Sequence, residues 1–404
     1  MQTSIHPQLI DLPLVKEADS ILRRCVHCGF CTATCPTYQL LGDELDGPRG
    51  RIYLIKNLLE NNDIDDQSVV HLDRCLTCRA CETTCPSGVQ YGRLLDIGRG
   101  LISKRSKRPL TIRMKSALLR WVIPRNHLML PLMRTGQFFR PVLPAAIARK
   151  IPPGQKRVAA ARAEMKSPHK RVLILQGCAQ RTATPNVNIA IEQLLAANNV
   201  SVSTLEGEGC CGAVEYHLSA HHQGLQRMRE LVDKLYERLG DIDYIVSSAS
   251  GCGATIKEYP LHLGEDSRYA EKAKLIIKKV LDISELIEKY QFKCKPIRAA
   301  VHTPCTLQHG QGINGTIERI LKRAGITIVT SRETHLCCGS AGTYSIMQAD
   351  LSQRLLKRKL EVLQEDSPEV IVTANIGCQL HLQSGAGVPV MHWVELLNQQ
   401  QSGS

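Results

Sequence analysis

The chain reads Cys-Val-His-Cys-Gly-Phe-Cys-Thr-Ala-Thr-Cys-Pro from Cys25 to Pro36 and Cys-Leu-Thr-Cys-Arg-Ala-Cys-Glu-Thr-Thr-Cys-Pro from Cys75 to Pro86. Both stretches follow the pattern C-x2-C-x2-C-x3-C-P, and the second begins fifty positions after the first. Two copies of such a pattern argue against a chance match. This pair of stretches is therefore the starting point for predicting the fold.

The spacing suits thiolate ligands of iron-sulfur clusters. In bacterial ferredoxins three cysteines two residues apart hold one 4Fe-4S cluster, and the fourth, followed by proline, binds the other cluster. On that pattern the first ligand set is Cys25, Cys28, Cys31 and Cys85. The second set is Cys75, Cys78, Cys81 and Cys35. A structural zinc site would need cysteines in two pairs, and a disulfide scaffold is the other alternative, so we favour two clusters over both.

The composition predicts a globular protein in a reducing compartment. The chain has 404 residues, enough for two or three domains, and 43% of them are hydrophobic. Its amino terminus lacks the charged and then apolar segments of a secretory signal, so we expect the seventeen cysteines to lie in the cytoplasm. No stretch predicts a transmembrane helix. The longest segment without acidic or basic residues, Val370 to Val394, suggests a buried strand followed by a site loop.

Positive charge is concentrated in one segment. The chain has a formal net charge of +13, and residues 101–171 contain eighteen Lys or Arg and one acid, Glu164. Apolar residues such as Trp121, Phe138 and Phe139 are mixed with them. This composition suits an amphipathic segment on an anionic membrane surface. The alternative is a basic linker packed between domains or against an acidic partner; nucleic acid is disfavoured because no recognised binding module accompanies the charge.

The sequence between the two cysteine stretches predicts a helix. It begins at Gly47-Pro48 and ends at Asn61-Asn62. Its apolar residues recur at helical spacing, and they are Ile52, Ile55, Leu58 and Leu59. We expect this helix to cover the clusters. Arg49 and Arg51 at its start either balance cluster charge or lie on a solvated face, and we favour the solvated face.

From Lys170 onward the chain contains an internal duplication. The strand-like segments that precede cysteine motifs are 171–175, 200–205 and 244–246 in the first half and 299–302, 326–330 and 370–373 in the second. Cys178 and Cys305 are 127 positions apart, as are Cys210 and Cys337. Each half therefore predicts an α/β unit, and its parallel strands would bring the cysteines together beyond their carboxyl ends.

The motifs of the duplicated half are Cys210-Cys211-Gly212 and Cys337-Cys338-Gly339. They resemble the cysteine-rich (CCG) domains of heterodisulfide reductase subunits. Joined to the ferredoxin-type pair, the arrangement resembles the iron-sulfur subunits of membrane-linked glycolate, lactate and glycerol-3-phosphate dehydrogenases. The residues within and around these motifs are most similar to those of the iron-sulfur subunits of glycolate oxidase, also called glycolate dehydrogenase. The resemblance covers nearly the whole chain.

This resemblance implies a fold that is α+β overall. A small α-helical domain with two 4Fe-4S clusters is expected first, followed by two duplicated α/β CCG domains. The expected boundaries are 1–100 for the ferredoxin-type domain, 101–170 for the basic connector, 171–293 for the first CCG domain and 294–404 for the second.

The resemblance also implies a function in electron transfer. FAD-binding glycolate oxidase subunits would oxidise glycolate to glyoxylate, with D-lactate as a further donor, and this chain would pass the electrons to a quinone or another acceptor. No catalytic residue is expected here. The alternatives are the same subunit in a D-lactate, glycerol-3-phosphate or heterodisulfide oxidoreductase, or a non-redox zinc or nucleic-acid module. We expect the protein to lie peripherally on the cytoplasmic face of the inner membrane.

Each CCG repeat keeps four candidate metal ligands. They are Cys178, Cys210, Cys211 and Cys252 in the first repeat and Cys305, Cys337, Cys338 and Cys378 in the second. The fullest form of the family's domain has a fifth cysteine, whose place is taken here by Thr255 and His381. Four thiolates suffice for a cluster, so we expect metal in at least one repeat. The alternatives are buried thiols without metal and, less favoured, His381 as an extra ligand.

Overall fold

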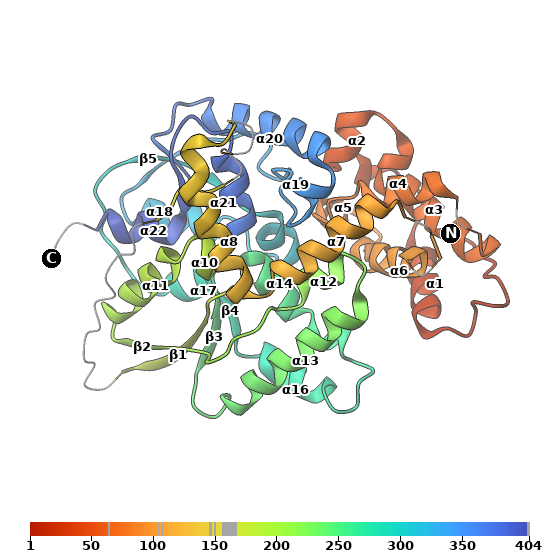
Figure 1. Cartoon of the computed structure of the whole chain (residues 1–404), viewed down its shortest axis with the longest axis horizontal. Helices are drawn as coiled ribbons and strands as arrows, with labels where there is room; N and C mark the ends of the chain where they lie inside the picture. The colour runs from red at the N-terminus through yellow and green to blue at the C-terminus, as the bar shows by residue number, and fades with distance from the viewer. Residues whose placement is uncertain are drawn as a thin grey trace.

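A computed structural model of the chain describes residues 1–63, 65–103, 105–106, 108–144, 148, 151–155 and 168–401. The chain forms a helical unit, two connector helices and two parallel sheets covered by helices (Figure 1). This mixed architecture confirms the predicted α+β fold class. Glu164 and several basic residues of the connector lie outside the described residues.

The helical unit contains both cysteine stretches. Its elements are α1 (Pro13–Arg24), η1 (Phe30–Thr32), α2 (Pro36–Leu41), η2 (Glu44–Asp46), α3 (Pro48–Asn61), α4 (Asp66–Asp73), α5 (Ala80–Thr84) and α6 (Tyr91–Ser103). The predicted helix is confirmed as α3, with proline in its first turn and Asn62 at a φ of 55° as its C-cap. Apolar residues of α1, α3, α4 and α6 form the core, and Cys25, Cys75 and Cys81 are part of it.

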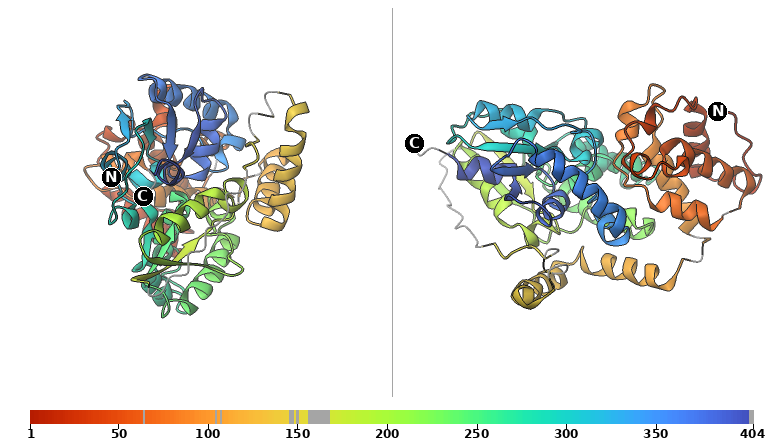
Figure 2. Two further views of the ribbon diagram at one scale, coloured as in Figure 1. Left: turned by 90° about the vertical axis from the view of Figure 1, so that its left-hand side faces the viewer. Right: turned by 90° about the horizontal axis from the view of Figure 1, so that it is seen from above.

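The described part of the connector contains the helices α7 (Leu110–Val122) and α8 (Asn126–Phe139) and the short η3 (Arg140–Val142). They run along one side of the molecule next to the sheets (Figure 2). Neither α7 nor α8 has a buried residue. Among the described residues no helix is both long and apolar enough to cross a membrane.

The first CCG unit is built on a parallel sheet with the strand order β2-β1-β3-β4. Its elements are β1 (Lys170–Leu175), α10 (Gln180–Ala183), α11 (Asn186–Ala196), β2 (Val200–Thr204), α12 (Ala213–His217), α13 (His221–Glu237), β3 (Tyr244–Ser247), α14 (Ser250–Lys257), α15 (Tyr259–His262), α16 (Ala270–Ile277), β4 (Val280–Asp282) and α17 (Ile283–Ile287). The sequence predicted β1, β2 and β3 but not the short edge strand β4.

The second CCG unit has the matching order β6-β5-β7-β8, also parallel. Its elements are β5 (Arg298–His302), η4 (Thr306–Gly310), α18 (Thr316–Arg323), β6 (Thr327–Val329), α19 (Tyr344–Met347), α20 (Ala349–Gln364), β7 (Val370–Thr373), α21 (Ile376–Gln383), β8 (Val390–His392) and α22 (Trp393–Gln399). The strand expected from Val370 is confirmed as β7. The site loop expected after it is wrong, because the segment forms α21 over Ile376–Gln383.

One hydrophobic core joins the two CCG units. It combines Val172, Val246 and Ile191 of the first unit with residues of the second such as Val372 and Trp393. The two units are also joined by a side-chain contact, since the Asn398 side chain of α22 donates a hydrogen bond of 2.7 Å to Gln193 of α11. The two units thus share their interior.

Candidate metal centres

The two cysteine loops have the same backbone shape. Each follows a helix, α1 or α4, and each contains two residues with positive φ at matching positions. These residues are His27 (55°) and Gly29 (84°) in the first loop and Thr77 (52°) and Arg79 (62°) in the second. Left-handed residues turn the chain sharply, so successive cysteines can face one point.

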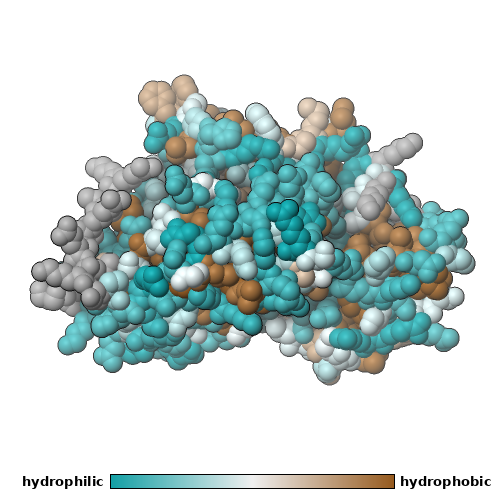
Figure 3. All heavy atoms as spheres, turned by 90° about the horizontal axis from the view of Figure 1, so that it is seen from below, coloured by the Kyte–Doolittle hydropathy of each residue, from teal (hydrophilic) through white to brown (hydrophobic). Residues whose placement is uncertain are grey.

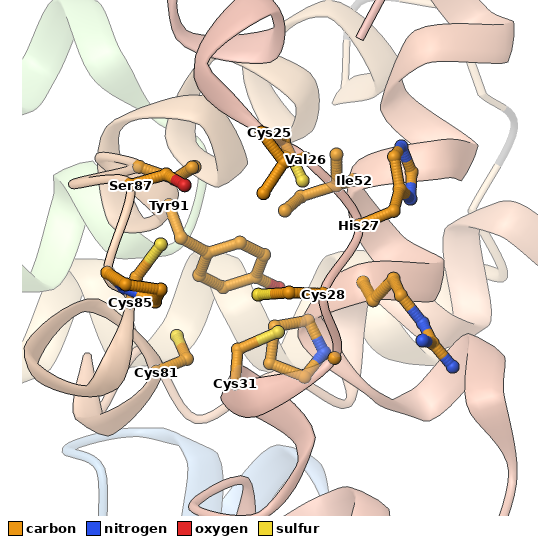
Figure 4. Close-up of a pocket in the computed structure, with 15 residues that line it drawn as sticks. Cys25, Val26, His27, Cys28, Cys31, Ile52, Cys81, Cys85, Ser87 and Tyr91 are labelled. Carbon is orange, nitrogen blue, oxygen red and sulfur yellow. The ribbon is translucent and has the colours of Figure 1, made fainter.

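The first predicted ligand set lines one cavity. The cysteines that border this hollow are Cys25, Cys28, Cys31, Cys85 and Cys81 (Figure 4). Cys81 was predicted for the other set. Burial, together with the nearby thiols of Cys25, Cys28 and Cys85, raises the pKa of the Cys31 thiol to about 11. These three neighbours are the other members of the predicted set.

The second predicted set is assembled in the same way. Burial raises the pKa of the Cys81 thiol well above its ordinary value, and Cys78, Cys75 and Cys35 add to the rise. Hydrogen-bond donors also face this set. The Thr77 amide lies 3.4 Å from the sulfur of Cys75, and the Tyr91 hydroxyl lies 3.6 Å from the same sulfur. The structure thus brings the crossed sets together, while their role as ligands stays a prediction.

Arg51 is a buried cation beside the second set, which corrects the prediction that it lies on a solvated face. Its side chain is fully buried. It donates a hydrogen bond of 2.7 Å to the His71 carbonyl and lies 3.3 Å from the Asp46 carboxylate. Burial disfavours the charged guanidinium, but Cys75, Cys35 and Asp46 hold the pKa of Arg51 above its ordinary value. Arg51 therefore offsets negative charge at the second set.

Arg49 is different, because it stays partly exposed at the border of the cavity that the first set lines. Its side chain is 38% exposed and pairs with Glu44 at 2.6 Å. No pattern in the sequence separates Arg49 from Arg51. Each arginine even has an acid five positions earlier in the chain, Glu44 for Arg49 and Asp46 for Arg51.

The chemistry of both sets fits iron-sulfur clusters. Eight thiols in two groups of four are the donor set that two 4Fe-4S clusters require. Because burial and mutual repulsion raise the pKa of Cys31, Cys78 and Cys81, a bound cation is needed to hold these thiols as thiolates near neutral pH. When bound, the clusters supply one-electron transfer.

The cysteines of each CCG unit gather where its strands end. The sulfur atoms of Cys178 and Cys210 are 3.6 Å apart, and those of Cys305 and Cys337 are 3.9 Å apart. The neighbouring thiols of Cys210 and Cys252 raise the pKa of Cys211, and the thiol of Cys378 raises that of Cys338. The structure therefore brings together all four predicted cysteines of each unit.

Steric constraints explain why glycine stands at the third position of each Cys-Cys-Gly motif. Gly212 and Gly339 have φ values of 88° and 90°, in the left-handed region. A Cβ at Gly212 would lie 2.7 Å from the Gly224 carbonyl, and one at Gly339 would lie 2.8 Å from the Ser352 carbonyl. Any other residue would push α13 or α20 away from the cysteines.

Thr255 and His381 stand where the family has a fifth cysteine, and each side chain has a hydrogen-bond partner of its own. Thr255 donates to the Gly251 carbonyl at 2.9 Å, one helical turn earlier. His381 lies 3.1 Å from the Ser352 hydroxyl. A histidine that the sequence analysis missed lies beside the cysteines: a ring nitrogen of His302 and the sulfurs of Cys338 and Cys378 all lie within 4.8 Å of one another. The only signal in the sequence was its position three residues before Cys305.

The second cysteine loop touches the second CCG unit. One hydrophobic cluster contains Leu76 and Cys78 from the loop and Cys305 and Cys337 from the CCG unit. The Tyr344 hydroxyl donates a hydrogen bond of 3.0 Å to the Arg74 carbonyl across the same contact. The second ferredoxin-type set and the cysteines of the second CCG unit are thus neighbours.

Comparison with protein families agrees with this division. Residues 21–89 match the family described as a 4Fe-4S dicluster domain. Residues 172–257 and 299–383 each match the family described as a cysteine-rich domain. The matched ranges contain both cysteine stretches and both groups of CCG cysteines.

Known proteins resemble the chain over nearly its whole length. The glycolate oxidase iron-sulfur subunit of Escherichia coli is 48% identical over 99% of both chains. A probable glycolate oxidase iron-sulfur subunit of Bacillus subtilis is 30% identical over 90% of this chain and 89% of its own. A crystal structure of a hypothetical protein from Helicobacter pylori covers 98% of this chain and 74% of its own, with a TM-score of 0.58 and 8% identity. That last similarity concerns the fold alone.

Proposed function

The chain belongs to the family of glycolate oxidase iron-sulfur subunits, and from this premise we propose that it transfers electrons within a complex that oxidises glycolate to glyoxylate. The observation that carries the proposal is the assembly of eight cysteines into two crossed sets. Such sets hold clusters that accept and release one electron at a time. The chain is thus an iron-sulfur subunit of an oxidoreductase.

The substrate chemistry is proposed for a partner subunit that carries FAD. Oxidation of glycolate releases two electrons and two protons, and a flavin can take both electrons together and release them singly. The residues of this chain hold the clusters, shield them from water and balance their charge. Arg51 and the hydrogen-bond donors around Cys75 serve the last purpose.

The contact between the second cysteine loop and the second CCG unit supports a role for that unit in the same pathway. Leu76 and Cys78 pack in one hydrophobic cluster with Cys305 and Cys337. The two groups of candidate sulfur ligands are therefore in side-chain contact. Cys78 and Cys305 are close enough for each thiolate to disfavour charge on the other. We propose that both CCG cysteine groups hold metal and that the second is in electronic contact with the ferredoxin-type pair.

We further propose that α7 rests on an anionic membrane surface. The apolar residues Leu110, Met114, Leu118 and Trp121 recur at helical spacing, and each is at least 54% exposed. Arg113, Lys115 and Arg120 lie on the same helix. Exposed apolar side chains flanked by basic ones suit the boundary between lipid head groups and acyl chains. The face shown in Figure 3 is mainly hydrophilic, with hydrophobic residues in separate groups.

A cavity supports a quinone as the electron acceptor. A pocket that is partly open to solvent lies between the second ligand set and α7, and Cys75, Leu76, Ile112, Ser116, Tyr344 and Met347 are among the residues that line it. A quinone takes up two electrons and two protons to become a quinol. A site that borders both a predicted cluster ligand and the proposed membrane-facing helix would serve this reaction.

The proposal is tested by removing one ligand from each set in the assembled complex. We expect Cys28→Ser and Cys78→Ser each to abolish electron transfer from glycolate to an artificial dye, because a cluster loses a ligand. The anaerobically purified chain should hold about eight irons from the ferredoxin-type sets, and more if the CCG units are filled. Cys294→Ser is the matched control, since this half-buried cysteine belongs to none of the four groups.

Two results would contradict the proposal. Full dye reduction by both serine variants would mean that the two sets are not needed for electron transfer. A colourless protein containing zinc in place of iron would exclude the function altogether. Comparing glycolate, D-lactate and glycerol 3-phosphate as donors of the same complex identifies the substrate, and we expect glycolate to be oxidised fastest.

A further inference from the structure

The second CCG unit contains a buried histidine without a hydrogen-bond partner. His302 is the last residue of β5 and is 1% exposed. Neither of its ring nitrogens has a hydrogen-bond partner among the described residues. Burying a polar group without a hydrogen bond is unfavourable, so such a group is expected to have an additional partner.

The partners within reach are cysteine sulfurs. A ring nitrogen of His302 lies within 4.8 Å of the sulfurs of both Cys338 and Cys378. Two other buried histidines of the same unit have ordinary partners: His381 lies 3.1 Å from Ser352, and His392 lies 2.9 Å from the Ser248 carbonyl. His381 and His392 are thus buried with a hydrogen-bond partner, whereas His302 is buried without one.

The first CCG unit has no histidine at the corresponding place. Counting back the 127 positions that separate the repeats leads from His302 to Leu175, which ends β1 and is buried. The same count leads from Lys359 to the buried Val232. Burial lowers the pKa of the Lys359 ammonium, while Cys338 and other thiolates nearby oppose this effect. The second site therefore has an imidazole and a cation where the first site has only aliphatic side chains.

We propose that His302 is a metal ligand of the second CCG unit. It binds iron of an iron-sulfur centre together with Cys338 and Cys378, while Cys305 and Cys337 complete the ligand group. Neutral imidazole is a common iron ligand, and thiolates suit iron-sulfur centres. The second unit then has mixed thiolate and imidazole ligation, and the first has thiolates alone. This inference rests on the proposed function in assigning metal to the second unit.

Mixed ligation changes the electron affinity of the centre. An imidazole as the additional ligand adds no negative charge to the four thiolates, whereas a fifth thiolate would add one and lower the reduction potential. The buried ammonium of Lys359, whose counterpart in the first unit is the aliphatic Val232, favours the reduced form of the centre. The second centre is therefore expected to have a higher potential with His302 than with a cysteine at that position.

The test is pulsed electron paramagnetic resonance of the full chain in its complex, purified anaerobically and reduced stepwise. The four proteins compared are the unchanged chain, His302→Leu, His302→Cys and His381→Leu. Leucine reproduces Leu175 of the first repeat, and His381→Leu removes a second buried histidine from the same unit as a matched control. Preparing the unchanged chain with 15N-labelled histidine identifies any nitrogen coupling as histidine nitrogen.

We expect a strong histidine nitrogen coupling in the unchanged chain and in His381→Leu, and its loss in His302→Leu. His302→Cys should keep the iron content but lose the coupling, and its centre should be reduced at a lower potential. The proposal is overturned if the labelled chain shows no such coupling, whether the second unit is empty or contains zinc, or if only His381→Leu removes it. The signals of the ferredoxin-type clusters report separately on the proposed function, so either hypothesis can fail alone.

Discussion

Arg51 and Arg49 are two positions apart on α3, yet their surroundings differ completely. Arg51 is fully buried with Asp46, which also accepts from Arg74 at 2.8 Å, and it lies near the thiols of the second set. Arg49 is partly exposed and pairs with Glu44. At this scale the decisive quantity is the cost of leaving a buried charge alone, which far exceeds the energy of a surface ion pair.

Replacing Arg51 should therefore be much more harmful than replacing Arg49. We expect Arg51→Met to lower the free energy of unfolding by about 3–5 kcal/mol, because the buried Asp46 loses a partner. Arg49→Met should cost about 0–1 kcal/mol. Denaturant titration of both variants measures the difference. If both variants lost the same free energy of unfolding, the buried contacts of Arg51 would contribute no more to stability than the surface pair of Arg49.

At the scale of elements, α7 is unusual because four of its large apolar side chains are exposed. Leu110, Met114, Leu118 and Trp121 are exposed along the helix, and no residue of α7 is buried. A helix with one apolar side normally packs that side against a core, since apolar burial provides most of its stability. The exposed side of α7 is consistent with the proposed lipid surface.

Tryptophan fluorescence can test this directly. The chain has two tryptophans, and Trp393 is fully buried, so changes in emission report on the exposed Trp121. We expect vesicles with anionic lipids to shift the emission to shorter wavelength, and neutral vesicles to have little effect. Leu118→Glu should weaken the binding at least several-fold.

The control is Leu261→Glu, which changes an exposed leucine of α15 outside the connector. Both substitutions are at exposed positions, so each should change stability by no more than about 0.5 kcal/mol. If both variants bind vesicles as the unchanged chain does, α7 does not contact the membrane.

At the scale of the whole molecule, the two CCG units share a core although each repeats the same chain pattern. Side chains from β1, β3 and α11 pack with those of β5, β7 and α22 in one hydrophobic cluster. The units also exchange hydrogen bonds, such as that between the Ser250 amide and the Ala374 carbonyl at 3.1 Å. We therefore expect them to unfold together rather than as independent domains.

A cavity in one unit should destabilise both. Trp393→Ala in α22 should cost about 3–5 kcal/mol, because this side chain is fully buried in the shared core. Hydrogen exchange should then accelerate in β1 and β3 as well as in β5 and β7. Leu94→Ala, in the separate core of the helical unit, should affect both sheets much less. Faster exchange confined to the second sheet would show that the units are independent.

The sequence predicted local features of the structure more completely than features that depend on distant segments. The cysteine spacing predicted the two ligand sets, and the periodic apolar residues predicted α3 and six of the eight strands. These features depend on residues close together in the chain. The short edge strands β4 and β8 were not predicted, because three residues carry too little pattern and their pairing partners are distant in sequence.

The sequence by itself determined which chemistry this protein can support, because a ligand set is defined by residue types at fixed spacing. Only the tertiary structure decided which charged and polar groups surround those ligands. It buried Arg51 beside the second set, brought His302 to Cys338 and Cys378, and placed Cys78 against Cys305. The physical reason is that burial and electrostatic interaction depend on distance in space, and the packing of distant segments sets that distance.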